Sequence, residues 1–244
     1  MFDATNLDWD SVLQKEKQLD FFLNVTVPAA KKRNDIIPHT LIICRYPRLT
    51  KFALDTLASQ FPDSQIQFIE SLGSTPGDLA AIITCMWDGT ILCLKDGISI
   101  NKMKTSSAAV LQQALSEAFI ELKLGKGNSA RTIRVDLPRF ALVTCYEHPQ
   151  HIRPGIKQHF EYVLEIGNLS DFEICAFEAN ACAHEHDIIL EDEAILLIAT
   201  ASNGDFRKTR RLIRWICDYM LVNNEQFDII PADYVKKAIE FRGI

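Results

Sequence analysis

Residues 40–58 read TLIICRYPRLTKFALDTLA, and this stretch decides the fold. Its first five residues form a continuous apolar run, which is typical of a parallel strand buried on both faces. A helix is predicted from Phe52, and residues 45–51 occupy the place of a phosphate-binding loop. Such a loop, G-x-x-x-x-G-K-[ST], needs glycines because its backbone N–H groups turn inward toward the phosphates. The first 72 residues contain no glycine, so the sequence predicts the strand and the helix without the phosphate nest.

Composition excludes several classes of protein. The apolar fraction of 48% and the charged fraction of 24% are ordinary globular values. A net charge of −6 gives no general attraction to nucleic acid or anionic membranes. No apolar run approaches the ~20 residues of a membrane span. The seven cysteines are odd in number and lack a disulfide framework, which indicates reduced thiols in a cytoplasmic protein.

Short apolar strands alternate with helical patterns over the first two thirds of the chain. The predicted strands are residues 40–44, 66–69, 91–94, 140–145 and 162–166. This alternation predicts a doubly wound parallel sheet. Only helical patterns follow, at 170–183, 191–201, 205–222 and 231–241. The sequence therefore predicts an α/β domain, residues 1–168, followed by a small all-helical domain, residues 169–244.

Two alternating segments between residues 120 and 135 flank a glycine-rich turn and predict a β-hairpin. Its apolar residues are Leu122, Leu124, Ile133 and Val135. They either pack back on the domain or form a protein-binding surface.

A cysteine and two histidines lie close together in the sequence at residues 182–186. They lack the ligand spacing of a zinc site, so no metal site is expected.

Four groups of residues, in order and at matching spacings, carry a resemblance to a known family. They are Ala29-Ala30-Lys31-Lys32-Arg33 with Pro38-His39; Gly77-Asp78-Leu79-Ala80-Ala81-Ile82; Gly125-Lys126-Gly127 with residues 130–133 and 136–138; and Gly204-Asp205-Phe206-Arg207 with residues 211–214 and 218–219. Over residues 6–244 the chain resembles the RuvB-like AAA+ ATPases, the motors of Holliday-junction branch migration. The resemblance implies a P-loop NTPase-like AAA+ core followed by a helical lid domain. The family's winged-helix DNA-binding domain would begin near residue 244, so we expect it to be lacking and direct DNA binding to be absent.

The resemblance also places the family's catalytic positions. Thr50 falls on the phosphate-binding lysine, and Lys51 falls on the Mg²⁺-binding threonine. Lys95 and Asp96 replace the Asp-Glu pair that holds Mg²⁺ and polarises water, and Lys157 replaces the arginine supplied to a neighbouring subunit. Phosphoryl transfer depends on positioning and electrostatic stabilisation. We therefore expect a protein that is not an enzyme and takes no cofactor, acting as a non-hydrolysing scaffold subunit in DNA recombination or repair.

Two alternatives remain. Lys51 and Arg207, which matches the family's second sensor arginine, could retain nucleotide binding; Arg207 could equally be a helix-start residue with no ligand. A second possibility is an ATP-hydrolysing branch-migration protein that uses ATP and Mg²⁺ with rerouted catalytic groups. The expected partner is a protein, either RuvA-like or an active AAA+ subunit, and self-assembly is also possible.

Overall fold

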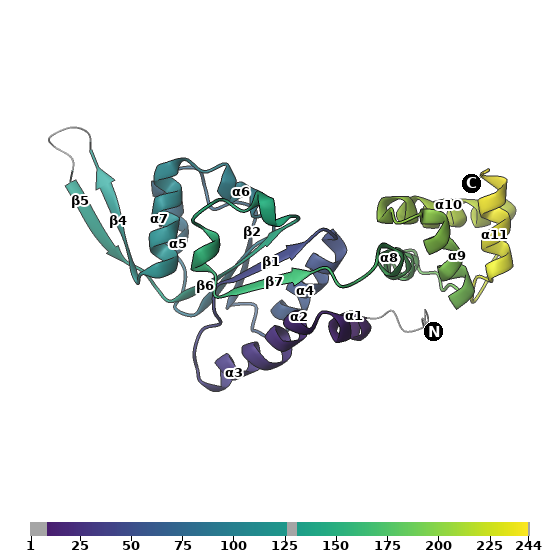
Figure 1. Cartoon of the computed structure of the whole chain (residues 1–244), viewed down its shortest axis with the longest axis horizontal. Coiled ribbons are helices and arrows are strands. Elements are labelled where there is room, and N and C mark those ends of the chain that lie inside the picture. The colour runs from purple at the N-terminus through teal and green to yellow at the C-terminus, as the bar shows by residue number, and fades with distance from the viewer. Residues whose placement is uncertain (1–8, 126–130, 244) are drawn as a thin grey trace. The chain divides into compact units, whose positions relative to one another are not determined.

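The computed structural model describes residues 9–125 and 131–243 (Figure 1). The chain divides into two compact units. One unit comprises residues 17–166, and the other comprises residues 167–244 together with the N-terminal residues up to Glu16. The sequence prediction placed residues 1–168 in one domain. The structure instead groups helix α1 (Trp9–Lys15) with the C-terminal unit.

A five-stranded parallel sheet forms the first unit, with the strand order β2-β3-β6-β1-β7. Its strands are β1 (Thr40–Cys44), β2 (Ile66–Ile69), β3 (Thr90–Leu94), β6 (Phe140–Tyr146) and β7 (Tyr162–Ile166). The strands β1, β3 and β6 are buried along their whole length, which explains their continuous apolar sequences. The predicted doubly wound AAA+ fold is confirmed.

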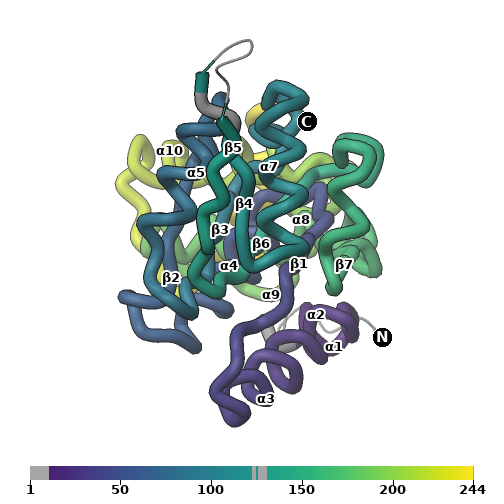
Figure 2. The backbone as a smooth tube through the Cα atoms, turned by 90° about the vertical axis from the view of Figure 1, so that its left-hand side faces the viewer, coloured from purple at the N-terminus to yellow at the C-terminus, as the bar shows by residue number. Residues whose placement is uncertain are grey.

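Helices cover both faces of this sheet (Figure 2). The main ones are α4 (Pro47–Ser59), α5 (Pro76–Thr84) and α7 (Thr105–Ser116). Leu41 and Ile43 belong to a hydrophobic cluster that includes residues of α5 and α7. Because side chains alternate along a strand, Ile42 and Cys44 face the opposite side, where α4 contacts β1. The shorter elements are α2 (Lys17–Phe21), η2 (Phe22–Thr26), α3 (Val27–Lys32), α6 (Ile98–Asn101), η4 (Pro149–His151) and η5 (Lys157–His159).

The hairpin consists of β4 (Phe119–Leu124) and β5 (Arg131–Asp136), and it projects from the first unit (Figure 1). Its register pairs Ile120 with Val135 and Leu122 with Ile133, so these apolar residues share one face. Arg134 lies on the other face, with its guanidinium 3.6 Å from the ring centroid of Phe119. The hairpin therefore has one apolar and one polar face.

The C-terminal unit contains α8 (Asp171–Glu185), α9 (Asp192–Ser202), α10 (Phe206–Asn223) and α11 (Ala232–Phe241) around a core of their apolar residues. Ser170 begins α8 in a capping box with Glu173, and Asn203 ends α9 in the left-handed conformation. Across the described residues, the helices are all too short or too polar to span a bilayer.

Candidate functional site

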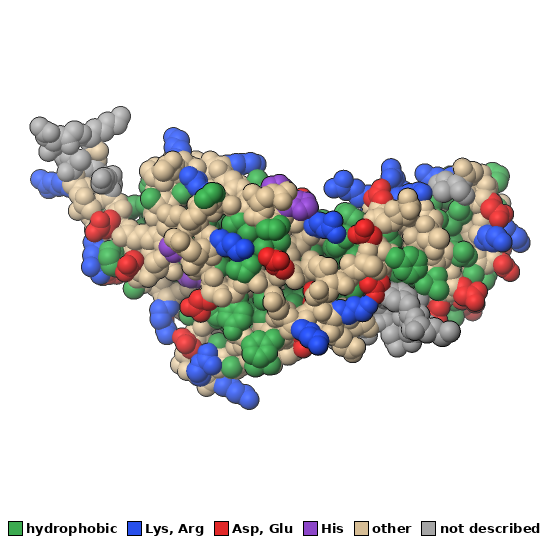
Figure 3. Space-filling model, in the orientation of Figure 1, with side chains coloured by type: hydrophobic (Ala, Val, Ile, Leu, Met, Phe, Trp, Pro, Cys, Tyr) green, Lys and Arg blue, Asp and Glu red, His purple; other side chains and the backbone are tan. Residues whose placement is uncertain are grey.

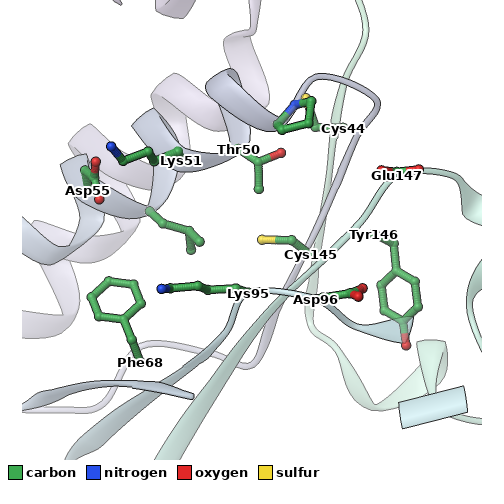
Figure 4. Close-up of a pocket in the computed structure, with 12 residues that line it drawn as sticks. Cys44, Thr50, Lys51, Asp55, Phe68, Lys95, Asp96, Cys145, Tyr146 and Glu147 are labelled. Carbon is green, nitrogen blue, oxygen red and sulfur yellow. The ribbon is translucent and has the colours of Figure 1, made fainter. Parts of the chain in front are cut away.

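A cavity of about 660 Å³ opens at the carboxyl ends of β1, β3 and β6, beside helix α4 (Figure 4). Ligand sites of open α/β sheets gather at this edge. The volume is within the range of small-molecule pockets. The lining residues are Cys44, Pro47, Thr50, Lys51, Leu54, Asp55, Phe68, Lys95, Asp96, Cys145, Tyr146 and Glu147.

The connection between β1 and α4 is shorter than the sequence predicted. Strand β1 ends at Cys44 and α4 begins at Pro47, so only two residues connect them. The expected loop over residues 45–51 and the helix start at Phe52 were wrong. Proline suits the first turn of a helix because its ring fixes φ and the missing N–H is not needed there. An additional helical turn therefore fills the space where a phosphate loop would lie.

Thr50 lies within this helix. Its backbone N–H donates to the Tyr46 carbonyl at 3.1 Å, and its hydroxyl reaches the same oxygen at 3.3 Å. Thr50 therefore stands one residue before Lys51 on the first turns of α4. The placement of the family's lysine position on Thr50 and of its threonine position on Lys51 stays a prediction.

One end of the cavity is cationic. Lys51 comes from α4 and Lys95 from the end of β3, and Asp55 lies beside Lys51 (Figure 4). The Lys95 ammonium is 3.6 Å from a carboxylate oxygen of Glu70 and 5.7 Å from the ring centroid of Phe68. This end therefore carries two ammonium groups on separate elements.

The other end carries Asp96 and Glu147 (Figure 4). The Asp96 carboxylate accepts a hydrogen bond from the Ile98 N–H at 2.8 Å and thereby supports the turn into α6. Asp96 points toward Tyr146 rather than toward the two lysines (Figure 4). Both lysines thus lie at one end of the cavity together with Asp55, and Asp96 and Glu147 lie at the other end.

The ring of Tyr146 packs against Gly97. A Cβ atom at Gly97 would lie 2.2 Å from this ring, so only glycine allows the contact. None of the residues that the structure describes offers a hydrogen-bond partner to the buried hydroxyl of Tyr146. Burial raises the pKa of Tyr146, and the nearby Asp96 charge raises it further. The tyrosine is neutral at physiological pH and acts as a packing group beneath the Asp96 turn.

Cys145 lines the cavity between the two ends (Figure 4). Burial is the main cause that raises the pKa of its thiol, and burial also raises the pKa of Cys93 to about 12. A neutral thiol is a poor nucleophile and a poor metal ligand. Cys93 and Cys145 are both buried and fill core space.

Four of the predicted positions come together in the cavity: Thr50, Lys51, Lys95 and Asp96. Lys157 lies in η5 and is not among the lining residues. Arg207 belongs to the C-terminal unit, where it begins α10 and its N–H donates to the Asp205 carboxylate at 2.9 Å. Sequence reasoning missed two cavity residues, Asp55 and Phe68. The only signal for Asp55 is its spacing of four residues after Lys51 on one helix face.

The hairpin residues differ in environment. Leu122 and Val135 are partly buried against the core cluster of the first unit. Ile133 is 45% exposed. The side chain of Leu124 lies outside the described residues. Packing on the domain therefore accounts for two of the four residues that were predicted to bind a partner.

No group of three or more histidine, cysteine, aspartate or glutamate side chains converges on a metal position within the described ranges. The Cys182 thiol instead reaches the Glu178 carboxylate at 3.6 Å. A metal ion in the cavity would therefore need some of its ligands from a bound substrate. Mg²⁺ usually takes such ligands from the phosphates of a nucleotide.

Residues 10–166 match a protein family described as the Holliday junction DNA helicase RuvB P-loop domain. The chain is 27% identical to the Holliday junction branch migration complex subunit RuvB of Nitratiruptor sp. over 97% of its length and 69% of that protein. It is 29% identical to the RuvB subunit of Kosmotoga olearia, over 91% of its length and 63% of that protein. A structure of a Thermotoga maritima RuvB mutant superposes with a TM-score of 0.71 at 23% identity, covering 94% of this chain and 71% of that one.

These matches overturn two expectations drawn from the sequence. The matched domain is described as that of a DNA helicase with a P-loop. Helicases are enzymes, and a P-loop binds nucleotide phosphates together with Mg²⁺. The expectations that the chain is not an enzyme and takes no cofactor are therefore wrong. They relied on single substituted positions, whereas the match extends over the whole α/β domain.

Proposed function

Because the chain belongs to the family of RuvB P-loop domains, we propose that it is a nucleotide-binding AAA+ subunit of a Holliday-junction branch-migration complex. The observation that carries this proposal is that the matched region contains every residue that lines the cavity. The chain spans 60–69% of the length of relatives such as those of Nitratiruptor sp. and Staphylococcus saprophyticus. Helicase activity of the whole relatives is therefore part of the proposal.

The charged lining of the cavity supports a nucleotide with its metal as the ligand. Phosphate oxygens would contact the ammonium of Lys51, which lines the cavity one residue after the predicted lysine position. Asp96 and Glu147 would offer carboxylates to Mg²⁺, which is usually held by one or two carboxylates and the phosphates of its substrate. The metal would neutralise phosphate charge. Arg207, the other residue predicted to contact nucleotide, remains a prediction.

Binding of ATP with Mg²⁺ should stabilise the folded chain. At an ATP concentration about 100 times the Kd, the gain is about 2.7 kcal/mol, which raises the Tm by several degrees in a protein of this size. Lys51→Ala should weaken ATP binding at least tenfold, because it removes a charged phosphate contact, of about 1.5–3 kcal/mol. Differential scanning fluorimetry and calorimetric titration measure both effects.

The exposed Lys102 at the end of α6 provides the matched control, and Lys102→Ala should bind ATP as the wild type does. An unchanged wild-type Tm in saturating ATP and Mg²⁺ would contradict nucleotide binding. Phosphate release from ATP distinguishes a hydrolysing subunit from one that only binds. The latter is the alternative in which Lys51 and Arg207 retain nucleotide binding.

The hairpin supports a protein partner in the same complex. Ile133 is exposed on the apolar face, beyond the part that packs on the domain. We expect this end of the hairpin to contact a RuvA-like subunit. Ile133→Asp should weaken that binding about tenfold or more, since it places a charge in an apolar contact. Surface plasmon resonance with the RuvA protein of the same genome measures the effect.

Thr132, on the opposite face of the same strand, supplies the control. Equal losses for Ile133→Asp and Thr132→Asp would argue against an apolar docking face. The predicted cytoplasmic location belongs to the same proposal. It is supported by the seven cysteines, all within the described residues, which form no disulfide bonds. Junction DNA would be held by the assembled complex, because the net charge of −6 gives this chain little attraction for it.

A further inference from the structure

The two ammonium groups of the cavity come from different parts of the fold. Lys51 projects from α4, whereas Lys95 is the first residue after β3 (Figure 4). We propose that Lys95 binds phosphate together with Lys51 and thereby gives the cavity a preference for polyphosphates over monophosphates. This inference rests on the proposed binding of a nucleotide in the same cavity.

The present contacts of Lys95 are easily exchanged for a ligand. Its side chain is 54% exposed, and its ion-pair partner Glu70 is 85% exposed at a separation of 3.6 Å. Exposed ion pairs of this kind contribute little to stability. The Phe68 ring lies beneath the ammonium and favours a cation at this position. Lys95 therefore lines the cavity while making only a weak, exposed ion pair, which a ligand could replace.

The short β1–α4 connection supplies the reason for a second cation. A P-loop holds phosphates mainly through the backbone N–H groups of its glycine-rich turn. Here two residues and a proline-started helix replace that turn. The Thr50 hydroxyl already donates to the Tyr46 carbonyl, so the ammonium groups of Lys51 and Lys95 are the charged donors that the lining residues offer to phosphate oxygens. Phosphate recognition in this cavity is thus carried by side-chain charge.

Both lysines also lie at the same end of the cavity, away from Asp96 and Glu147 (Figure 4). Asp55 lies beside Lys51 and Glu70 pairs with Lys95, but a phosphate chain between the two lysines would bring negative charge close to both ammonium groups at once. A chain of several phosphates carries more negative charge and reaches farther than a single phosphate. A polyphosphate chain can contact both ammonium groups at once. A single phosphate bound at Lys51 makes only the first of these contacts.

The experiment measures the affinity of the full chain for ATP, AMP and inorganic tripolyphosphate by calorimetric titration, each with Mg²⁺ and with EDTA. Lys95→Ala should reduce affinity for ATP and tripolyphosphate about 10- to 100-fold, as expected for a lost charged hydrogen bond, and change AMP affinity less than twofold. Lys95→Arg should restore most of the loss because it keeps the charge. Lys102→Ala serves as the control and should leave all affinities unchanged.

Three results would overturn the inference. Unchanged ATP affinity in Lys95→Ala would remove Lys95 from the site while leaving nucleotide binding in place. Equal losses for ATP and AMP, or no recovery with arginine, would show a structural effect through Phe68 or Glu70 instead of a phosphate contact. Absence of ATP binding in the wild type would overturn the proposed function as well, so the two failures are distinguishable.

Discussion

Asn168→Asp is expected to destabilise the C-terminal unit by about 3 kcal/mol at neutral pH. The reason is a buried carboxylate. Glu16 is 2% exposed and accepts two hydrogen bonds from Asn168, one from its backbone N–H at 2.8 Å and one from its side-chain amide at 2.9 Å. Aspartate has the same shape as asparagine but replaces the donating amide with a second negative charge.

These contacts tie the end of α1 to the start of the C-terminal helices. The amide of Asn168 also donates to the Lys15 carbonyl at 3.3 Å, and the Lys15 ammonium pairs with Glu173. Glu173 in turn caps α8 through Ser170. Disrupting the Glu16 contact should therefore loosen both α1 and the first turn of α8.

Urea unfolding measures the loss of stability, and hydrogen exchange of the α1 and α8 peptides locates it. Glu16→Gln in the Asn168→Asp background provides a sharp control, because the glutamine amide can donate to the new carboxylate. The double variant should recover more than half of the lost stability. A loss below about 0.5 kcal/mol, the range of ordinary surface substitutions, would mean that the contact between Glu16 and Asn168 contributes nothing to stability in solution.

The sequence predicted the regular elements well, because their signals are local. The five strands are apolar runs that a doubly covered parallel sheet requires, and the four C-terminal helices carry apolar residues at helical spacing. The contact between Glu16 and Asn168 could not be predicted in this way. The two residues are 152 positions apart, and neither belongs to a periodic pattern or a motif.

The region between β1 and α4 shows a second limit. The position of the site at the carboxyl end of β1 could be predicted, since strand order fixes where such sites lie. The length of the connection could not, because Arg45 to Leu49 are compatible with a loop or with a first helical turn. The same holds for the hairpin, where alternation identifies an apolar face but does not say which of its residues pack on the domain.

His39 should make the stability of the first unit depend on pH. Its ring lies between β6 and α7: Nδ1 accepts a hydrogen bond from the Leu142 N–H at 2.9 Å, and the ring also bonds to the backbone of Leu115. Burial lowers the pKa of His39 from 6.5 to about 4, partly opposed by the Leu115 contact and reinforced by the nearby His159. The folded protein therefore holds this ring neutral.

The sign of the effect follows from proton binding. Between pH 4 and 6.5 the unfolded chain binds a proton at this histidine that the folded chain does not bind. The stability due to the neutral ring is fully present above pH 6.5 and is lost as the pH falls toward 4, by about 3 kcal/mol in all. A protonated ring could no longer accept the Leu142 hydrogen bond.

The comparison with His39→Asn isolates this group. Asparagine places an acceptor near the Leu142 N–H but has no proton to gain, so the variant should be less stable at pH 7.5 and lose less stability than the wild type on acidification to pH 4.5. The pKa values of Asp78 and Asp88 are lowered in the folded protein. The stability that these carboxylates contribute is therefore lost only as the pH falls below their ordinary pKa near 3.8, outside this window. Parallel pH dependence of the urea unfolding free energy in the two proteins would show that His39 is hydrated or protonated in the folded state.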